Sequence, residues 1–575
     1  MIKLFKFLKP YTASIIAVLV LVFFQSLSEL YLPTLMSNIV DTGIVKGDTN
    51  YILKVGGIML LVAAAGTICT VFASFLSSKI ATGFGKILRN NVFSRVESYS
   101  LEEFDKIGTS SLITRTTNDI NQVQQVIIII LRMMVSAPMM CIGGIIMAVS
   151  KEPKLSLIIV AVIPILAISI FMVVRKGIPL FKIMQTKLDK LNLVLREGLT
   201  GIRVIRAFNR DDHEKKRFNE ANLDLTSTAI KVNKIMAALM PVMMLVLNLT
   251  TVAIIWFGGK RIELGYMQVG DLMAFIQYVM QIMFSLIMVS MMFVLVPRAS
   301  ASAIRINEVL NIVPQINDPE EGKVSKGKRG YVEFRNVTFS YPGAGEPAIK
   351  NISFSAGPGE VTAIIGGTGS GKSTMINLIP RFYDVDSGNV LVDDIDVREV
   401  SQEDLREKIG FVPQKAVLFS GTIEENIRYG KEDASKEEII HASEIAQATE
   451  FIGNMQDGFN SVIAQGGTNV SGGQKQRLSI ARALVRKPEI YIFDDSFSAL
   501  DFKTDAKLRA ALKEETKNST MIVVAQRVST VMNADRIIVL DEGEIVGMGT
   551  HRELLNNCGI YREIVSSQLS EEELV

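Results

Sequence analysis

Ile365-Gly-Gly-Thr-Gly-Ser-Gly-Lys-Ser373 follows the short apolar run that starts at Val361, and this order decides the fold of the C-terminal half. A buried strand, a glycine loop and a helix in succession form the phosphate-loop pattern. Glycines let backbone N–H groups converge on phosphate oxygens. We predict that Lys372 reaches the β- and γ-phosphates of a nucleotide and that Ser373 ligates Mg²⁺. The predicted nucleotide ligands of this loop are Gly366, Gly367, Thr368, Gly369, Ser370, Gly371, Lys372, Ser373 and Thr374.

A second apolar run, Ile490-Tyr-Ile-Phe-Asp494, also reads as a buried parallel strand. Its final aspartate is a weak signal alone, because many strands end in Asp. About 120 residues after a phosphate loop, however, Asp494 is well placed to hold the magnesium shell together with Ser373. The C-terminal half is therefore predicted to be an α/β P-loop NTPase domain.

A third motif, Val470-Ser-Gly-Gly-Gln-Lys-Gln-Arg477, runs straight into a predicted helix. With it the chain resembles the ATP-binding cassette (ABC) transporters, whose signature loop has this sequence. The resemblance implies that the loop faces the γ-phosphate of ATP held by a second subunit, as expected for anion binding at a helix start. The alternative is an ordinary Ser N-cap followed by two glycines. The residues concerned are Ser471, Gly472, Gly473 and Gln474.

Other elements of the family match in order. Tyr341 stands where the family stacks an aromatic ring on adenine, and Gln414 stands in the loop that senses Mg²⁺ and touches the membrane domain. Ser498-Ala-Leu-Asp501 matches the loop that crosses to the partner site. The resemblance thus implies ATP and Mg²⁺ as cofactors, with Ser373, Gln414 and Asp494 around the metal.

Two positions depart from the family pattern. The usual Glu after the strand-end Asp is replaced by Asp495, and the usual switch-loop His by Gln526. Asp is shorter by about 1.5 Å, and a displacement of about 1 Å can cost on the order of 100-fold in rate. We therefore expect ATP to bind this chain's own loop and to be hydrolysed slowly. The alternative is that Asp495 works as a shortened base in a normal site.

The N-terminal half is of the membrane class. Hydrophobic residues make up 48% of the chain and mean hydropathy is +0.30, with the excess in the first 300 residues. A membrane-spanning helix needs about 20 apolar residues. Six stretches qualify, at about 13–36, 53–77, 126–149, 155–175, 235–258 and 272–297. Lysines and arginines concentrate in 78–125 and 175–234, which predicts that these loops and both termini are cytoplasmic.

The two basic loops read as helical arms, with chain reversals expected near Phe104–Ile113 and Ala207–His213. In the family resemblance, Thr109–Asp119 and Gly201–Phe208 match exporter arms that end in coupling helices. The basic, apolar N-terminus resembles a signal peptide, but no cleavage pattern follows it, so a surface-lying helix fits better. The predicted parts are an interfacial helix (1–12), a six-helix membrane domain (13–300), a linker (301–330) and a cassette (331–575).

The net charge and the positions of the cysteines bear on the partners and metal sites that the protein is expected to have. The formal net charge of +2 gives no reason to expect a nucleic-acid partner. Cys69, Cys141 and Cys558 are far apart, so neither a disulfide framework nor a cysteine metal site is predicted. The three histidines are also scattered.

The sequence says less about the transported cargo than about the fold or the nucleotide site. Glu29 and Gln25 fall inside the first span, where an ionisable group marks a functional candidate that attracts cationic cargo; a hydrogen bond to Asn248 or Gln277 is an equal alternative. Arg132 is expected to snorkel to the interface. Methionines suit either a cargo surface or packing between helices. They cluster in the spans, at Met236, Met240, Met243, Met244, Met280, Met283, Met288, Met291 and Met292.

Together these features predict one subunit of a heterodimeric, ATP-driven exporter of lipophilic compounds in a bacterial plasma membrane, in contact with membrane lipid. A second half-transporter would supply the competent ATP site. The alternatives are a lipid or peptide exporter, homodimeric or heterodimeric, and a nucleotide-gated regulatory subunit without net transport.

Overall fold

A computed structural model describes residues 1–323, 325 and 327–568. The chain divides into two compact units. One comprises Met1–Glu97 and Ser110–Ile312, and the other comprises Ser98–Thr109 and Val313–Val575. The last seven residues of the predicted cassette, 569–575, lie outside the described residues.

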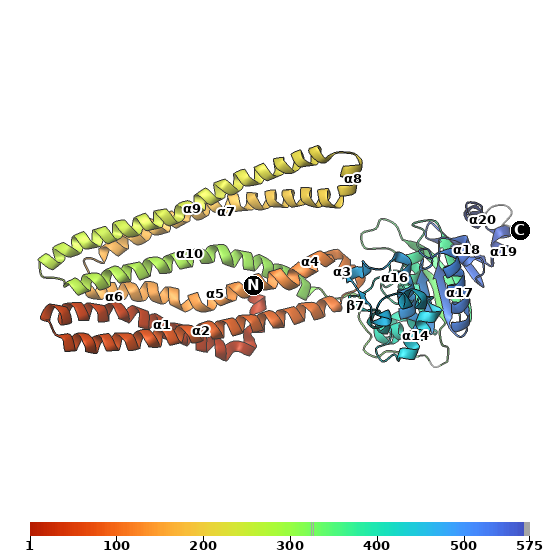
Figure 1. Cartoon of the computed structure of the whole chain (residues 1–575), viewed down its shortest axis with the longest axis horizontal. Coiled ribbons are helices and arrows are strands. Elements are labelled where there is room, and N and C mark those ends of the chain that lie inside the picture. The colour runs from red at the N-terminus through yellow and green to blue at the C-terminus, as the bar shows by residue number, and fades with distance from the viewer. Residues whose placement is uncertain (324, 326, 569–575) are drawn as a thin grey trace. The chain divides into compact units, whose positions relative to one another are not determined.

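The first unit is all-helical (Figure 1). Six of its helical segments are long and apolar enough to cross a bilayer, which confirms the six predicted spans. A short helix, η1 (Ile2–Tyr11), precedes them. The helices are α1 (Thr12–Asn38), α2 (Thr49–Glu97), the consecutive α4 (Thr109–Thr114), α5 (Ile120–Pro138) and α6 (Gly144–Lys151), α7 (Leu157–Thr200), α9 (Asp211–Glu263) and α10 (Val269–Asn311).

Three π-helical turns interrupt these helices: η2 (Ile39–Ile44), η3 (Arg115–Asp119) and η4 (Met139–Gly143). A π turn inserts one residue into the helical repeat and often marks a functional position. The apolar pattern of the sequence did not predict these π turns.

Both chain reversals begin before their predicted positions. The first is built around α3 (Leu101–Ile107), which starts at the Ser100–Glu103 capping box and ends at Gly108, whose φ is 79°. The predicted range Phe104–Ile113 was therefore too late, because the helix resumes at Thr109. The second reversal is α8 (Ile202–Ala207), flanked by Gly201 and by Asn209 with φ 51°.

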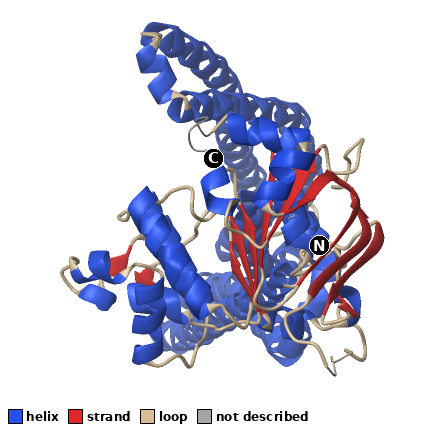
Figure 2. Cartoon of the chain, turned by 90° about the vertical axis from the view of Figure 1, so that its right-hand side faces the viewer, coloured by secondary structure: helices blue, strands red, loops and turns tan. Residues whose placement is uncertain are grey.

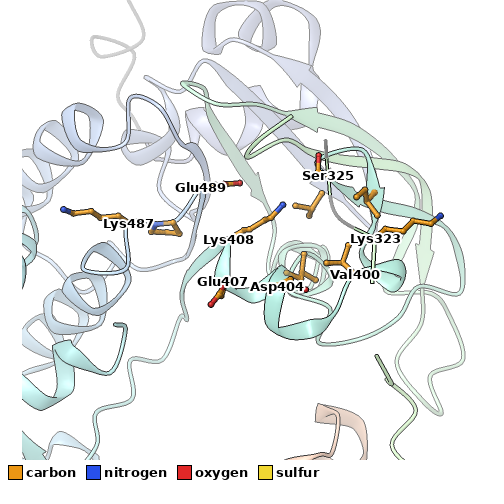
Figure 3. Close-up of a pocket in the computed structure, with 12 residues that line it drawn as sticks. Lys323, Ser325, Val400, Asp404, Glu407, Lys408, Lys487 and Glu489 are labelled. Atoms are coloured by element: carbon orange, nitrogen blue, oxygen red, sulfur yellow. The ribbon is translucent and has the colours of Figure 1, made fainter. Parts of the chain in front are cut away.

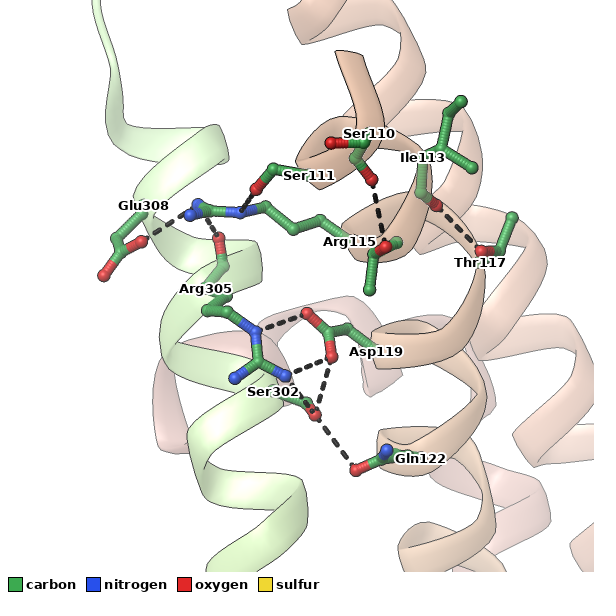
Figure 4. Close-up of polar contacts among 11 residues, drawn as sticks. Ser110, Ser111, Ile113, Arg115, Thr117, Asp119, Gln122, Ser302, Arg305 and Glu308 are labelled. Atoms are coloured by element: carbon green, nitrogen blue, oxygen red, sulfur yellow. Dashed lines mark hydrogen bonds and ion pairs between the residues drawn. The ribbon is translucent and has the colours of Figure 1, made fainter. Parts of the chain in front are cut away.

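Near the start of α5 a buried charge joins two distant helices (Figure 4). Asp119, the last residue of η3, is 1% exposed, and both of its oxygens accept hydrogen bonds from Arg305 of α10. The Ser302 hydroxyl donates to the same carboxylate over 2.9 Å. Arg115, the first residue of η3, bonds to the Arg305 carbonyl oxygen and to Glu308. The π turn thus begins and ends on residues that bind α10.

Helices α7 and α9 pack along each other as a hairpin that α8 closes (Figure 1). Near the ends remote from α8, residues such as Ile159, Leu166 and Ile254 join the core formed with α10. Towards α8 the hairpin exposes large apolar side chains, including Leu199 and Phe208.

The span methionines are divided between buried and exposed positions. Met243 and Met283 are buried in the helical core, whereas Met240, Met244, Met280 and Met288 are exposed and Met236 and Met292 are half-buried. The side chain of Met291 lies outside the described set. Arg132 is exposed on α5.

The cassette unit contains two main sheets (Figure 2). A four-stranded antiparallel sheet has the order β2 (Ile349–Ala356), β1 (Val332–Phe339), β4 (Ser387–Val392), β5 (Ile395–Asp396). The six-stranded sheet has the order β12 (Glu544–Gly549), β11 (Arg536–Asp541), β3 (Val361–Gly366), β10 (Thr520–Val524), β9 (Ile490–Asp494), β6 (Ile409–Val412). All its pairings are parallel except that of β12. A small ribbon pairs β7 (Gly421–Thr422) with β8 (Val462–Ile463).

Both faces of the six-stranded sheet are covered. In β9, Tyr491 and Phe493 belong to one hydrophobic core and Ile490 and Ile492 to the other. Parallel strands buried on both faces read as continuous apolar runs, which is why the runs at 361 and 490 were recognisable. The helices of this unit, besides α3, are α11 (Lys372–Leu378), α12 (Gln402–Glu407), α13 (Ile423–Arg428), α14 (Lys436–Ile445), α15 (Thr449–Gly453), α16 (Gly472–Leu484), α17 (Phe502–Glu515), α18 (Val528–Val531), α19 (His551–Asn557) and α20 (Gly559–Ser566).

Candidate functional site

The predicted site residues meet at the carboxyl edge of the parallel sheet. The glycine loop follows β3, Asp494 ends β9, Gln526 comes two residues after β10 and Gln414 two residues after β6. These strands are neighbours in the order β3, β10, β9, β6. Ligands of open α/β sheets bind in the crevice outside the carboxyl ends of the strands. Here that crevice is a cavity of about 390 Å³.

Most of the predicted ligands line this cavity, namely Tyr341, Thr368, Gly369, Gly371, Lys372, Ser373, Thr374, Gln414, Asp494, Asp495 and Gln526. Gly366, Gly367 and Ser370 are not among its lining residues. They form the base of the loop, where the carbonyl oxygens of Gly366 and Gly367 accept hydrogen bonds from Lys372 over 3.0 and 2.6 Å.

The loop needs glycine at its last turn. Gly371 has φ of 100°, and a Cβ there would lie 2.7 Å from the carbonyl oxygen of Ala348. Only glycine adopts this conformation without strain and without a clash. The backbone is thereby free to approach a bound phosphate closely.

Lys372 and the two strand-end acids give the cavity its electrostatics. Lys372 is 8% exposed, and burial lowers the pKa of its ammonium group, an effect that Asp495 and Asp494 oppose. The Ser373 hydroxyl donates to Asp494 over 3.1 Å, while burial raises the pKa of Asp494. A cation held by two carbonyl oxygens, beside a hydroxyl and a carboxylate, matches the donor set for a triphosphate and a hard divalent metal. The residues present therefore fit Mg²⁺ and ATP, which would supply a charged phosphoryl group and its neutralising metal.

Asp495 is engaged by both neighbouring amides. Its Oδ2 accepts hydrogen bonds from Gln526 Nε2 over 3.2 Å and from Gln414 Nε2 over 3.4 Å. The residue is 9% exposed, its φ is 45°, and burial raises the pKa of its carboxyl group. The two positions that depart from the family pattern are thus bonded to each other. Motif reading placed both near the same water but gave no sign of this bond.

Tyr341 lies at the rim formed by the antiparallel sheet. Its hydroxyl pairs with Thr374 Oγ1 at 3.1 Å, and its ring packs edge-on against Phe339 and Tyr383. An aromatic ring is therefore held beside the first helix after the loop, and it lines the same cavity as Lys372.

The signature loop lies on a separate exposed surface of the cassette. Ser471 caps α16 in a capping box: the Gln474 amide N–H donates to Ser471 Oγ, and the Ser471 N–H donates to Gln474 Oε1 over 2.8 Å. Ser471 and Gly472 are exposed, and neither they, Gly473 nor Gln474 line the 390 Å³ cavity. Within one copy of the chain, the described residues that line the nucleotide cavity therefore include the phosphate loop but not the signature loop.

Sequence reasoning missed that α3 belongs with the cassette unit. Glu103, 6% exposed, accepts a hydrogen bond from the Gln315 backbone N–H over 3.0 Å, and Glu102 pairs with the Gln315 side chain. Although burial opposes the shift, bonds from Ser100 and Gln315 hold the pKa of Glu103 below its ordinary value. Burial, with smaller contributions from Tyr341, Asp105 and Glu102, raises the pKa of Tyr383 to about 12. The Ser100-x-x-Glu103 capping pattern was readable in the sequence.

A second cavity of the cassette, of about 350 Å³, contains none of the predicted site residues (Figure 3). Lys408 and Glu489, on its wall, immediately precede β6 and β9. It therefore lies at the amino ends of the strands, on the opposite edge of the sheet from the nucleotide cavity.

Comparison with known proteins agrees with this geometry. Residues 15–286 match the ABC transporter transmembrane region family, and residues 349–498 match the ABC transporter family. The uncharacterised ABC transporter ATP-binding protein YfiB of Bacillus subtilis is 41% identical over 570 residues, covering 99% of both chains. The chain belongs to the ABC transporter family.

Two further relatives and one solved structure are similar to this ABC transporter over most of their length. An uncharacterised ABC transporter ATP-binding protein of Mycobacterium tuberculosis is 44% identical over 565 residues, covering 98% of this chain and 97% of its own. The ATP-dependent lipid A-core flippase of Syntrophus aciditrophicus is 34% identical over 506 residues, covering 88% and 84%. A bacterial Atm1-family ABC exporter with ATP bound superimposes with a TM-score of 0.82 at 25% identity, covering 98% of this chain and 99% of that one.

The chain is therefore an ABC exporter half-transporter, a multi-pass membrane protein with one ATP-binding cassette. Its cassette binds ATP with Mg²⁺, and proteins of this family are ATPase-coupled transporters whose exporters function as dimers.

Proposed function

We propose that this chain is one half of a heterodimeric exporter of lipophilic compounds, and that its own ATP site hydrolyses slowly while its signature loop completes a competent site on the partner. The 13–300 region would carry the cargo and the 331–575 region the nucleotide. Both termini would be cytoplasmic, in a bacterial plasma membrane.

One observation carries the proposal: the Asp495 carboxylate is one methylene short of the family's Glu and is bonded by Gln526 and Gln414. A general base must lie within hydrogen-bond reach of the proton that it abstracts. A shorter side chain whose Oδ2 already accepts two amide donors is poorly placed to orient and deprotonate a water. Gln526 is neutral and cannot supply the positive charge that a protonated His brings to the γ-phosphate.

The intact signature loop supports the proposal that this chain completes the ATP site of a partner subunit. It argues against an inactive protein. Ser471 and Gln474 maintain a capped, exposed helix start in the chain whose own cavity is altered. Free backbone N–H groups at the start of a 13-residue helix suit an anion brought by another subunit. A second half-transporter with Glu and His at the altered positions would receive it.

The test is ATP hydrolysis by purified protein in lipid nanodiscs. We expect the chain alone to release phosphate slowly, and co-expression with a half-transporter carrying Glu and His to restore turnover. In that heterodimer, Lys372→Ala in this chain should leave hydrolysis largely intact, whereas the matching lysine substitution in the partner should abolish it. Robust turnover by a homodimer of this chain contradicts the proposal.

A lipid cargo is the alternative that one comparison favours, because the relative from Syntrophus aciditrophicus is a lipid A-core flippase. Stimulation of the ATPase by many unrelated lipophiles supports a broad lipophilic cargo. Stimulation by one lipid class alone supports the dedicated lipid exporter.

A further inference from the structure

One carboxylate lies deep within the membrane-spanning helices. Glu29 is nine residues before the end of α1 at Asn38, which is about 13 Å along the helix axis, and seventeen residues after its start. Its side chain is exposed. Gln25, one turn earlier, donates a hydrogen bond from Nε2 to Glu29 Oε1 over 3.1 Å. Of the residues that the structure describes, no basic side chain is paired with Glu29.

The carboxylate sits where α1 meets α10. Gln281 of α10 donates to the backbone oxygen of Glu29 over 3.1 Å, and Tyr278 bonds to Thr34 and to the Leu30 carbonyl oxygen. The Gln281 side-chain oxygen is buried and has no hydrogen-bond partner among the described atoms. The hydrogen bonds considered for Glu29 with Asn248 or Gln277 are not formed among these residues, and both amides are exposed. At the α1–α10 junction, the group that is open to a ligand is therefore the exposed Glu29 carboxylate, whereas the Gln281 oxygen is buried.

The adjoining face of α10 is lipophilic. Met273, Met280, Phe284 and Met288 are exposed, together with Gln277, and their spacing of three or four residues places them on one side of the helix. The opposite side, with Phe275, Tyr278, Val279 and Ile282, is buried in the helical core. Methionine and phenylalanine give this face polarisable, adaptable contacts.

The Glu29 carboxylate makes the combined surface of α1 and α10 unsuited to contact with acyl chains. A charged group at bilayer depth is costly, and such residues face the bundle interior or a water-filled cavity rather than acyl chains. We therefore expect a surface that combines Glu29, Gln25 and Gln277 with methionine and phenylalanine to face the interior of the assembled transporter rather than acyl chains. Its chemistry complements a ligand that is apolar over most of its surface and carries one positive charge.

We propose that Glu29, with Gln25 and the exposed face of α10, forms a subsite that selects lipophilic organic cations over uncharged lipophiles. The charged centre of the ligand lies against the Glu29 carboxylate, and Phe284 offers its ring face to the same cation. This inference rests on the proposed function and deepens it, because it names the charge of the preferred cargo.

The experiment compares two probes of the same shape and different charge, tetraphenylphosphonium and tetraphenylsilane. Binding of each is measured on the full-length chain assembled with its partner in nanodiscs, without ATP, so that turnover does not enter the readout. Glu29→Gln removes the charge and keeps the size. We expect it to weaken tetraphenylphosphonium binding about tenfold, or about 1.4 kcal/mol, and to leave tetraphenylsilane binding unchanged.

Two further variants make the result specific. Glu29→Asp keeps the charge and should retain most of the cation affinity. Glu263→Gln removes another exposed carboxylate, at the end of α9, and should change neither probe. ATP binding by the cassette confirms that each variant is folded.

The inference is overturned if Glu29→Gln leaves tetraphenylphosphonium binding unchanged, or if it weakens both probes equally, since the role of Glu29 is then structural. Failure of the wild-type protein to bind either probe contradicts instead the proposed lipophilic cargo. The two failures are therefore distinguishable.

Discussion

At the scale of single residues, the informative feature is the bond between the two altered positions. Asp495 and Gln526 are 31 residues apart and meet because β9 and β10 are neighbours with parallel ends. The Gln526 side-chain amide donates a hydrogen bond to the short Asp495 carboxylate. The two residues therefore act as a unit, and changing either alone leaves the other without its complement.

Restoring the family pattern at both positions should raise hydrolysis at this chain's own site. We expect Asp495→Glu with Gln526→His to increase phosphate release by about 100-fold, since the carboxylate regains about 1.5 Å of reach. Each single change should give much less. The matched control adds Lys372→Ala, which should abolish the gain. A single substitution that equals the double one contradicts the pairing.

Asp495 also predicts a pH dependence of cassette stability. Burial raises the folded-state pKa of Asp495, so the folded cassette keeps this proton at pH values where the unfolded chain has lost it. Its contribution to stability therefore falls as pH rises from the ordinary carboxyl pKa through the raised one, and remains low above it. Without nucleotide, Asp495→Asn should raise the unfolding temperature of the cassette by about 2–4 °C at pH 7 and hardly at all near pH 3.5. Lower thermal stability of the variant at pH 7 argues against this account.

At the scale of elements, the junction of η3 with α10 deserves a quantitative test because its two ion pairs differ in burial. Asp119 is 1% exposed, whereas Glu308, the partner of Arg115, is 53% exposed. Removing a partner from a buried charge leaves that charge uncompensated, while an exposed pair in water contributes little. The two pairs lie one helical turn apart on the same helices.

Arg305→Ala should therefore destabilise the helical unit by about 3 kcal/mol, and Glu308→Ala by less than about 1 kcal/mol. Thermal unfolding in detergent, followed by far-ultraviolet circular dichroism, measures both. Arg305→Ala combined with Asp119→Leu should recover much of the lost stability, because no charge then remains buried. Equal effects of the two alanine variants are incompatible with the burial difference.

Secondary structure could be predicted from the sequence where a functional motif stands next to a clear hydrophobic pattern. The phosphate loop that ends at Ser373 and the apolar strand before it are the example. The π turns were not, because an inserted residue leaves the apolar pattern almost unchanged. The start of the first reversal was mistaken although Ser100 and Glu103 announce a helix. The hydrogen bonds to Asp495 depend on strand order, which no local motif encodes.

At the scale of the whole molecule, the signature loop and the phosphate loop form separate surfaces of one chain. A cysteine at Ser471 should cross-link to a cysteine in the partner's phosphate loop when ATP is present, with at least several-fold less product without it. Ser435→Cys is a matched control, since Ser435 is also an exposed capping-box N-cap, at α14. Cross-linking of the control with equal yield, or none at Ser471, refutes the shared site.

The α7–α9 hairpin has a consequence for the life of the protein in the cell. Its α8 end exposes Leu199 and Phe208, and among the described residues α7 packs mainly on α9. A newly synthesised subunit that has not yet assembled with its partner therefore exposes an apolar hairpin to quality-control proteases. For the heterodimer that we propose, degradation of whichever subunit is in excess would then set the ratio of the two subunits after synthesis.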